Sequence, residues 1–262
     1  MKVKTLILRA AGTNCDRETE YAFHLVGCET ELVHVNELIR RQHVLDDCHI
    51  LVVPGGFTYG DDIAAGKILA NELEHKLQEP IRRFIGEGKL ILGICNGFQV
   101  LVKAGLLPGE SDGAASQSVT LTFNDSGKFE DRWVHLKVVD DDTCIFTRGL
   151  AGSLYIPVAH AEGKFVPRSD DVREALWKNN QVVLQYVDPH GALGGYPWNP
   201  NGSVDNIAGI CDPTGRIFGL MPHPERHIDP TNHPRWTRGL RAEEGEGLAI
   251  FRNAAEFVRH NL

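Results

Sequence analysis

One cysteine lies in a setting that predicts a nucleophile. Cys95 follows the apolar run 89–92, has Gly93 and Gly97 on either side, and stands where a helical pattern begins. Glycines leave no Cβ to clash at a sharp bend, and such a strand-to-helix turn presents a side chain for attack. The helix N-terminus favours a thiolate, and the N–H of Asn96 can donate to a developing oxyanion. The pattern predicts acyl transfer through a thioester.

The alternative is that Cys95 only packs, since free cysteines are among the most buried residues of proteins. Its place between two glycines at the end of a strand, rather than within an apolar periodicity, favours the nucleophile.

A cysteine nucleophile needs a base, and the base needs a group that fixes its tautomer. His223 and Glu225 follow the apolar run 217–221, and residues two apart in extended backbone share a side, so the imidazole and the carboxylate can meet. His160 and His227 also have an acidic residue two positions later. We rank both below His223, because His227 lies further from the strand end and its partner Asp229 precedes a proline.

The oxyanion requires a second donor, and the glycine-rich turn 54–61 follows another apolar run. There the N–H of Gly56 can complete the oxyanion hole with Asn96. The turn lacks the GxGxxG and GxxxxGK[ST] patterns, which argues against a nucleotide site. Gln99 is one helical turn beyond Cys95, so it faces the same side and could hold a polar substrate.

The elements that must position these residues alternate in the first half of the chain. The apolar patterns predict strands at 3–8, 31–35, 49–53 and 89–93, and helices at 16–26, 62–87 and 96–103, with Asp16 and Asn36 as caps and a break at Pro80. Further strands are expected at 118–123, 133–139, 154–158, 181–187, 207–211 and 217–221, and a final helix at 247–260. This order predicts an α/β fold with a mostly parallel central sheet, helices on both faces and antiparallel additions in the second half.

We expect one domain over residues 1–262, with 188–205 as an ordered loop inside it. Ligand sites of such sheets gather at the carboxyl ends of the strands, where Gly55, Gly56 and Cys95 all lie.

Composition narrows the function classes. The chain has 262 residues and a formal charge of −8, which argues against nucleic-acid binding. Its six cysteines form no CxxC pair and its N-terminus does not resemble a signal peptide, so we expect a cytoplasmic protein. It has no apolar run of about 18 residues, which predicts no membrane span. Twelve histidines form no HExxH motif, and we expect no metal site.

With these residues assembled, the chain resembles the class I, triad-type glutamine amidotransferases. Within them it most closely resembles the glutaminase subunits of phosphoribosylformylglycinamidine synthase. The resemblance spans nearly the whole chain, and the stretches that carry it are GTNCDRET at 12–19, GGFTYGDDIAAG at 55–66, GICNGFQ at 93–99, VAHAEGKF at 158–165, NPNGSVDNIAGICDPTG at 199–215 and MPHPER at 221–226.

The resemblance implies a flavodoxin-like, three-layer fold and a Cys95–His223–Glu225 triad that hydrolyses the side-chain amide of glutamine. It also implies that Gly55, Phe57, Gln99 and His160 lie at the glutamine. Ammonia then passes to a separate synthetase subunit, and a third, small subunit often bridges the two. Because uncoupled hydrolysis would waste ammonia, we also expect the isolated chain to hydrolyse glutamine slowly. ATP and Mg²⁺ are expected on the synthetase, so we expect no cofactor on this chain.

Three other functions remain open from the sequence. The chain could be a glutaminase that feeds a different synthase, a cysteine hydrolase of the same fold, or a non-enzymatic subunit that keeps the fold. Segments 125–133, 140–151 and 230–246 are longer than in compact members of the family, and their role is open. The last contains Arg235, Arg238 and Arg241, which are either solvated or in contact with a partner.

Overall fold

The computed structural model describes residues 2–109, 117–139, 142–150, 152–238 and 242–262. Its centre is a nine-stranded sheet with the order β2-β1-β3-β4-β11-β10-β9-β6-β7. These strands are β1 (Lys4–Arg9), β2 (Glu29–His34), β3 (Ile50–Val53), β4 (Leu90–Ile94), β6 (Glu130–Val138), β7 (Ser153–His160), β9 (Val182–Val187), β10 (Ile207–Cys211) and β11 (Ile217–Leu220). A separate antiparallel pair joins β5 (Val119–Thr122) to β8 (Lys164–Pro167).

The sheet changes character at β11. From β2 to β11 every neighbouring pair is parallel, and from β11 through β10, β9 and β6 to β7 every pair is antiparallel. The predicted fold class is therefore confirmed: a mostly parallel first half carries antiparallel strands from the second half.

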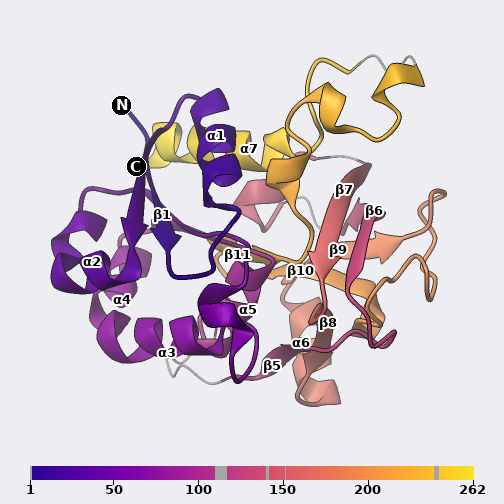
Figure 1. The fold of residues 1–262 in the computed structure, drawn as a ribbon, viewed down its shortest axis with the longest axis horizontal. Helices are drawn as coiled ribbons and strands as arrows, with labels where there is room; N and C mark the ends of the chain where they lie inside the picture. Colours follow the sequence, from indigo (N-terminus) through magenta and orange to yellow (C-terminus); the bar gives the residue numbers. More distant parts are fainter. Residues whose placement is uncertain (1, 110–116, 140–141, 151, 239–241) are drawn as a thin grey trace.

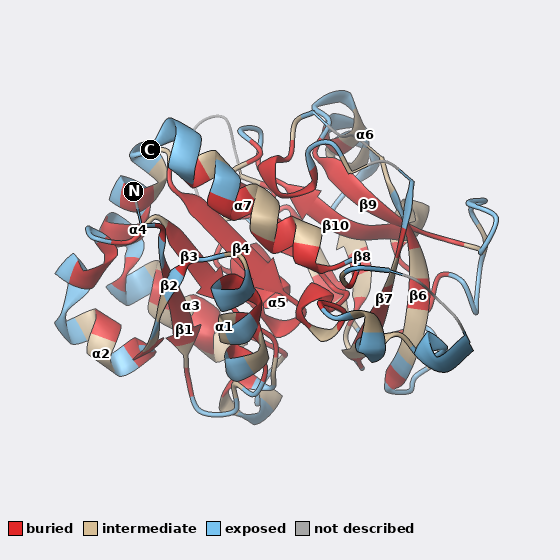
Figure 2. Cartoon of the chain, turned by 90° about the horizontal axis from the view of Figure 1, so that it is seen from above, coloured by how far each residue is buried: buried red, intermediate tan, exposed pale blue. Residues whose placement is uncertain are grey.

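Helices cover both faces of the sheet. On one face α1 (Asp16–Leu25) packs against α7 (Leu248–Asn261), and the rings of Phe23 and Phe251 meet edge to face at 5.1 Å. On the other face lie α3 (Lys67–Lys76) and α5 (Asn96–Lys103), as Figure 1 shows. The strands between them are largely buried (Figure 2). Because a parallel strand is covered on both faces, β3 and β4 are apolar along their whole length except for Gly93.

The remaining elements are short. They are α2 (Val35–Arg40), α4 (Gln78–Gly86) and α6 (Asp170–Lys178), with 3₁₀ turns η1 (Gln42–Leu45), η2 (Thr58–Asp61), η3 (Ile145–Thr147), η4 (Val204–Asn206), η5 (Pro224–Arg226), η6 (Pro230–Asn232) and η7 (Trp236–Arg238). No helix in the described part of the chain is long and apolar enough to cross a membrane.

Both predicted caps were wrong. The N-cap of α1 is Cys15, and Asp16 is the first helical residue, where its carboxylate pairs with Arg9 at 2.6 Å. The N-cap of α2 is His34, whose ring accepts a hydrogen bond from the Asn36 N–H. In both cases a residue one or two positions earlier takes the cap.

Two other predictions in the helical regions need correction. The helix expected over 62–87 begins at Lys67, and the break falls at Leu77 rather than Pro80, which is the third residue of α4. Strand β8 and helix α6 were not predicted. Ser169, whose hydroxyl accepts from the Val172 N–H, and the acidic residues that follow it are the signal that marks the start of α6.

Candidate active site

Cys95 stands on a strained turn between β4 and α5. Its φ of +50° and ψ of −106° lie outside the conformations that a side chain ordinarily adopts, and such strain persists where the surrounding structure enforces it. Gly97 provides part of that enforcement, because a Cβ there would lie 1.7 Å from the Val53 carbonyl oxygen. The elbow predicted from the glycines is therefore present, with α5 pressed directly onto β3.

His223 and Glu225 form a buried pair after β11. The imidazole Nδ1 and a Glu225 carboxylate oxygen lie 2.6 Å apart, and both side chains are almost completely inaccessible to solvent. Burial alone would lower the pKa of His223. The negative charges of Glu225 and then of Cys95 outweigh it, so the pKa of His223 is raised well above 6.5.

The thiol and the imidazole meet loosely. The negative charge of Cys95 helps to raise the pKa of His223, so the two side chains are neighbours. The buried His223 Nε2 nevertheless has no partner at ordinary hydrogen-bond geometry, and the thiol instead donates to the Ala159 carbonyl oxygen at 3.7 Å. Catalytic hydrogen bonds are often long or poorly aligned in an empty site, and this arrangement is of that kind.

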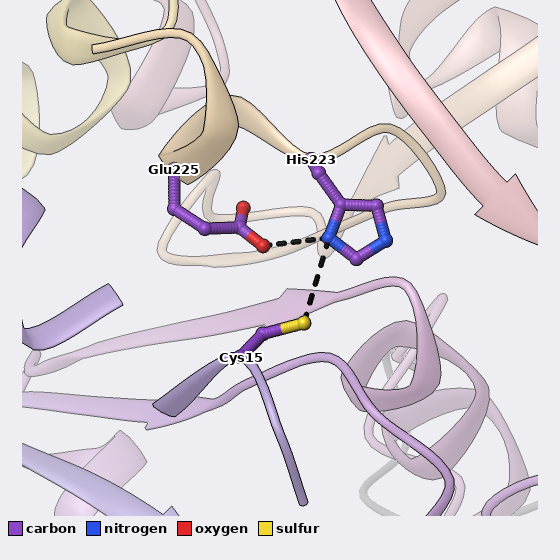
Figure 3. Close-up of side chains that lie close together, drawn as sticks. All are labelled: Cys15, His223 and Glu225. Carbon is purple, nitrogen blue, oxygen red and sulfur yellow. Dashed lines mark hydrogen bonds and ion pairs between the residues drawn. The ribbon is translucent and has the colours of Figure 1, made fainter. Parts of the chain in front are cut away.

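A second cysteine, Cys15, lies next to the triad, and the sequence did not predict its place there. The Cys15 sulfur lies 3.9 Å from His223 Nδ1. Figure 3 shows that it faces the same nitrogen as the Glu225 carboxylate. The Arg226 guanidinium donates to this sulfur at 3.2 Å and to Glu18 at 2.9 Å. Burial is the main reason that the pKa of Cys15 rises to about 11, so it remains a neutral thiol. The segment 12–19 was noted as distinctive, but nothing local in it points to His223.

Cys15, His223 and Glu225 also offer three potential metal ligands, with atoms within 4.8 Å of one another. Because His223 Nδ1 already bonds to Glu225, a cation there would displace the hydrogen bond that orients the ring. The arrangement therefore fits a catalytic pair better than a resident metal.

The candidate oxyanion donors lie beside Cys95. Gly56 has a φ of +148° and forms an antiparallel bridge with Thr13, in which the Phe57 N–H bonds to Gly12. In such a bridge the N–H of Gly56 itself points away from Thr13 and stays available. Asn96 begins α5, so its N–H has no acceptor within the helix. The two predicted donors are thus on adjacent turns of the same edge.

A small cavity of about 40 Å³ opens at the sulfur. It is lined by Gly56, Phe57, Asp61, Ala65, Cys95, Gln99, Ala159, His160, Ala161 and Glu162. Of the four predicted glutamine-binding residues, Phe57, Gln99 and His160 line this cavity. Gly55 does not line it, and it lies under the His223 ring, where an added Cβ would come within 2.8 Å of Cε1.

The Gln99 side chain is already engaged. Its amide nitrogen donates to the Glu162 carbonyl oxygen at 2.6 Å, and its amide oxygen accepts from Asn96 at 2.9 Å. Gln99 therefore fixes the cavity wall formed by 159–162.

The structure distinguishes His223 from the other two candidate bases, His160 and His227. The His160 Nδ1 donates to Asn124 at 3.1 Å, and burial followed by the charge of His223 lowers the pKa of His160 to about 3. His160 is consequently neutral near pH 7. The Nδ1 of His227 donates to the Tyr155 carbonyl oxygen at 2.7 Å, and His227 does not line the cavity.

Four neighbouring strands bring the whole site together. In the sheet order β1-β3-β4-β11, the carboxyl ends lead to Cys15, Gly56, Cys95 and His223 respectively. The predicted convergence of Cys95 with His223, which lie far apart in the chain, is present in the structure.

Comparisons with known proteins agree with one another. Residues 2–258 match the CobB/CobQ-like glutamine amidotransferase domain. The chain is 54% identical, over 98% of both sequences, to the phosphoribosylformylglycinamidine synthase subunit PurQ of Dehalococcoides mccartyi. It is 42% identical, over 97% of both, to the subunit of that name in Methanococcus maripaludis. A chain in the structure of PurLQS from Thermotoga maritima superimposes with a TM-score of 0.75 at 32% identity, covering 98% of this chain and 100% of that one.

Proposed function

We propose a mechanism for a chain that belongs to the class I glutamine amidotransferases, in the family of PurQ glutaminase subunits of phosphoribosylformylglycinamidine synthase. The chain is an enzyme that releases ammonia from glutamine for that synthase. The observation that carries the mechanism is the strained Cys95 elbow beside the buried His223–Glu225 pair.

In the first half of the reaction, His223 takes the proton of Cys95, and the sulfur attacks the amide carbon of glutamine. Glu225 holds Nδ1 protonated, so that Nε2 is the basic nitrogen and the imidazolium that forms is stabilised. The N–H groups of Gly56 and Asn96 stabilise the negative oxygen of the tetrahedral intermediate. His223 then protonates the departing ammonia, which leaves a glutamyl thioester on Cys95.

In the second half, His223 removes a proton from water, which attacks the thioester carbonyl. The same two N–H groups stabilise the second oxyanion, and glutamate leaves as Cys95 regains its proton. Ammonia goes to the synthetase subunit, where ATP and Mg²⁺ bind and formylglycinamide ribonucleotide becomes the amidine.

The partner is also the proposed activator. The cavity of about 40 Å³ has room for little more than one water molecule, so it must widen before glutamine can bind. We infer that docking of the synthetase, in a cytoplasmic complex that includes a small bridging subunit, widens it. The isolated chain would then hydrolyse glutamine slowly and waste little ammonia.

A glutaminase that feeds another synthase would use the same chemistry, but the PurQ relatives match this chain from end to end. A cysteine hydrolase of the same fold that is not an amidotransferase has no comparable support. A non-enzymatic role would leave the strain at Cys95 without a purpose.

The mechanism is tested by covalent labelling with 6-diazo-5-oxo-L-norleucine, a diazo-ketone analogue of glutamine, followed by peptide mass spectrometry. We expect one label per chain, on Cys95, with labelling lost in Cys95→Ser and retained in Cys15→Ser. Label on Cys15, or undiminished labelling of Cys95→Ser, would refute the assignment of the nucleophile.

A further inference from the structure

Two carboxylates in the cavity have no assigned role. We propose that Asp61 and Glu162 bind the α-ammonium group of glutamine and so select free glutamine over other primary amides. This inference rests on the proposed function, because it assumes that glutamine occupies the cavity beside Cys95.

Both residues share the wall of one cavity with the Cys95 sulfur. Asp61 and Glu162 line the same cavity as Cys95, and Gln99 ties the Glu162 backbone to α5 one turn beyond Cys95. One helical turn rises about 5.4 Å. The amide carbon and α-nitrogen of an extended glutamine are about 5 Å apart, since four bonds of about 1.5 Å join them. A substrate with its amide at Cys95 therefore reaches about one helical turn along the wall that holds these carboxylates.

The charges at this end of the cavity are unbalanced. Asp61 and Glu162 repel each other, and burial followed by that repulsion raises the pKa of Asp61. Lys103 acts on both carboxylates as a compensating cation, and its buried ammonium donates to the Ala65 carbonyl oxygen at 2.5 Å. Two carboxylates facing one ammonium leave a net negative charge, which a substrate cation would neutralise.

The carboxylates are held in place but not saturated. Asp61 accepts from the Asn96 side chain at 3.1 Å and from the Gly66 N–H, while Glu162 accepts from the Ala65 N–H at 3.4 Å. An ionised carboxylate has about four acceptor positions, so each retains capacity for an ammonium N–H. Both are only partly buried, so they are open to a ligand once the cavity has widened.

A buried nitrogen beside Cys95 also lacks a hydrogen-bond partner, although its residue does not line the cavity. His223 Nε2 is buried, unpartnered and adjacent to Cys95, which marks where the reacting amide must lie. The glutamine carboxylate cannot occupy the acidic end without facing two like charges. The substrate is therefore oriented with its amide at His223 and Cys95 and its ammonium at Asp61 and Glu162.

The test compares two substrates in the complex of the full chain with its synthetase. We would measure kcat/KM for L-glutamine and for 4-carbamoylbutanoate, which is glutamine without its amino group. Loss of charge-assisted hydrogen bonds predicts that the wild type prefers glutamine by about 100-fold. In Asp61→Asn and in Glu162→Gln this preference should fall at least about tenfold, mainly through KM for glutamine. Glu174→Gln, on the exposed side of α6, is the matched control and should keep the full preference.

An equal loss on both substrates would assign these residues a structural role and overturn the proposal, as would an unchanged preference. Should the variants fold poorly, the wild type provides a second measurement. L-glutamate should protect Cys95 from the diazo-ketone at a concentration at least about tenfold lower than glutarate does. Equal protection would also overturn the proposal. Failure of the wild type to hydrolyse glutamine at all would instead refute the proposed function.

Discussion

Replacing His160 with glutamine should remove one component of the acid sensitivity of the fold. His160 is buried, its Nδ1 donates to Asn124, and its pKa is lowered to about 3 from 6.5. The unfolded chain binds a proton at this position below pH 6.5, whereas the folded protein does so only near pH 3. Stability contributed by the neutral ring is therefore present above pH 6.5 and is lost as the pH falls.

The magnitude follows from the size of the shift. At about 1.36 kcal/mol for each pH unit, a pKa displaced from 6.5 to about 3 corresponds to about 5 kcal/mol of stability at full effect. Between pH 7 and pH 5 the loss attributable to His160 is about 2 kcal/mol. Glutamine cannot titrate, so His160→Gln should lack this loss, although its lost hydrogen bonds would lower its stability at pH 7 by about 1 to 3 kcal/mol.

The assay is urea unfolding at several values between pH 5 and pH 7, with the free energy of unfolding plotted against pH. His75→Gln, which changes an exposed histidine of α3, is the control and should keep the wild-type slope. A slope for His160→Gln that matched the wild type within about 0.5 kcal/mol over this range would show that His160 titrates normally, and our account of its burial would be wrong.

Two further substitutions test the elbow and the pair. Glu225→Gln should reduce kcat for ammonia release by about 10³- to 10⁴-fold. An amide can donate to Nδ1, and the proton of the neutral ring then sits on Nε2, which faces Cys95 and can no longer act as the base. Activity within about tenfold of the wild type, measured with a coupled ammonia assay, would contradict this role. Gly97→Ala should destabilise the fold by about 1 to 3 kcal/mol or more in urea unfolding and abolish activity, because its Cβ would clash with β3. The control is Gly86→Ala in α4, where an added Cβ meets nothing within 4 Å, and it should be neutral or stabilising in the same experiment.

The reactive centre was predictable where its signals are local. The glycines around Cys95 report a sharp turn, and the helix 96–103 was predicted with the bounds that the structure has. The pairing of His223 with Glu225 required only the alternation of extended backbone. The meeting of Cys95 with His223 required one more assumption, that consecutive strands end at the same edge of the sheet.

What could not be predicted depends on contacts between distant segments. The role of Cys15 comes from the approach of α1 to the turn after β11, which no local pattern encodes. The same holds for Asp61 and Glu162, which come from different loops. Aspartate is a residue type that often caps helices, which is why Asp16 was predicted as a cap. In the structure it is instead the first residue of α1 and pairs with Arg9, so the helix begins one residue earlier than predicted.

The position of β11 in the sheet also affects the order in which the enzyme becomes active during synthesis. During synthesis the turn that carries Cys95 is made long before the segment that carries His223. Strand β11 must pair with β4 before the imidazole can reach the thiol. A nascent chain, or one truncated before His223, therefore has a nucleophile without the base that activates it. Ammonia cannot escape from a half-made polypeptide, since the last strand to join the parallel set completes the site.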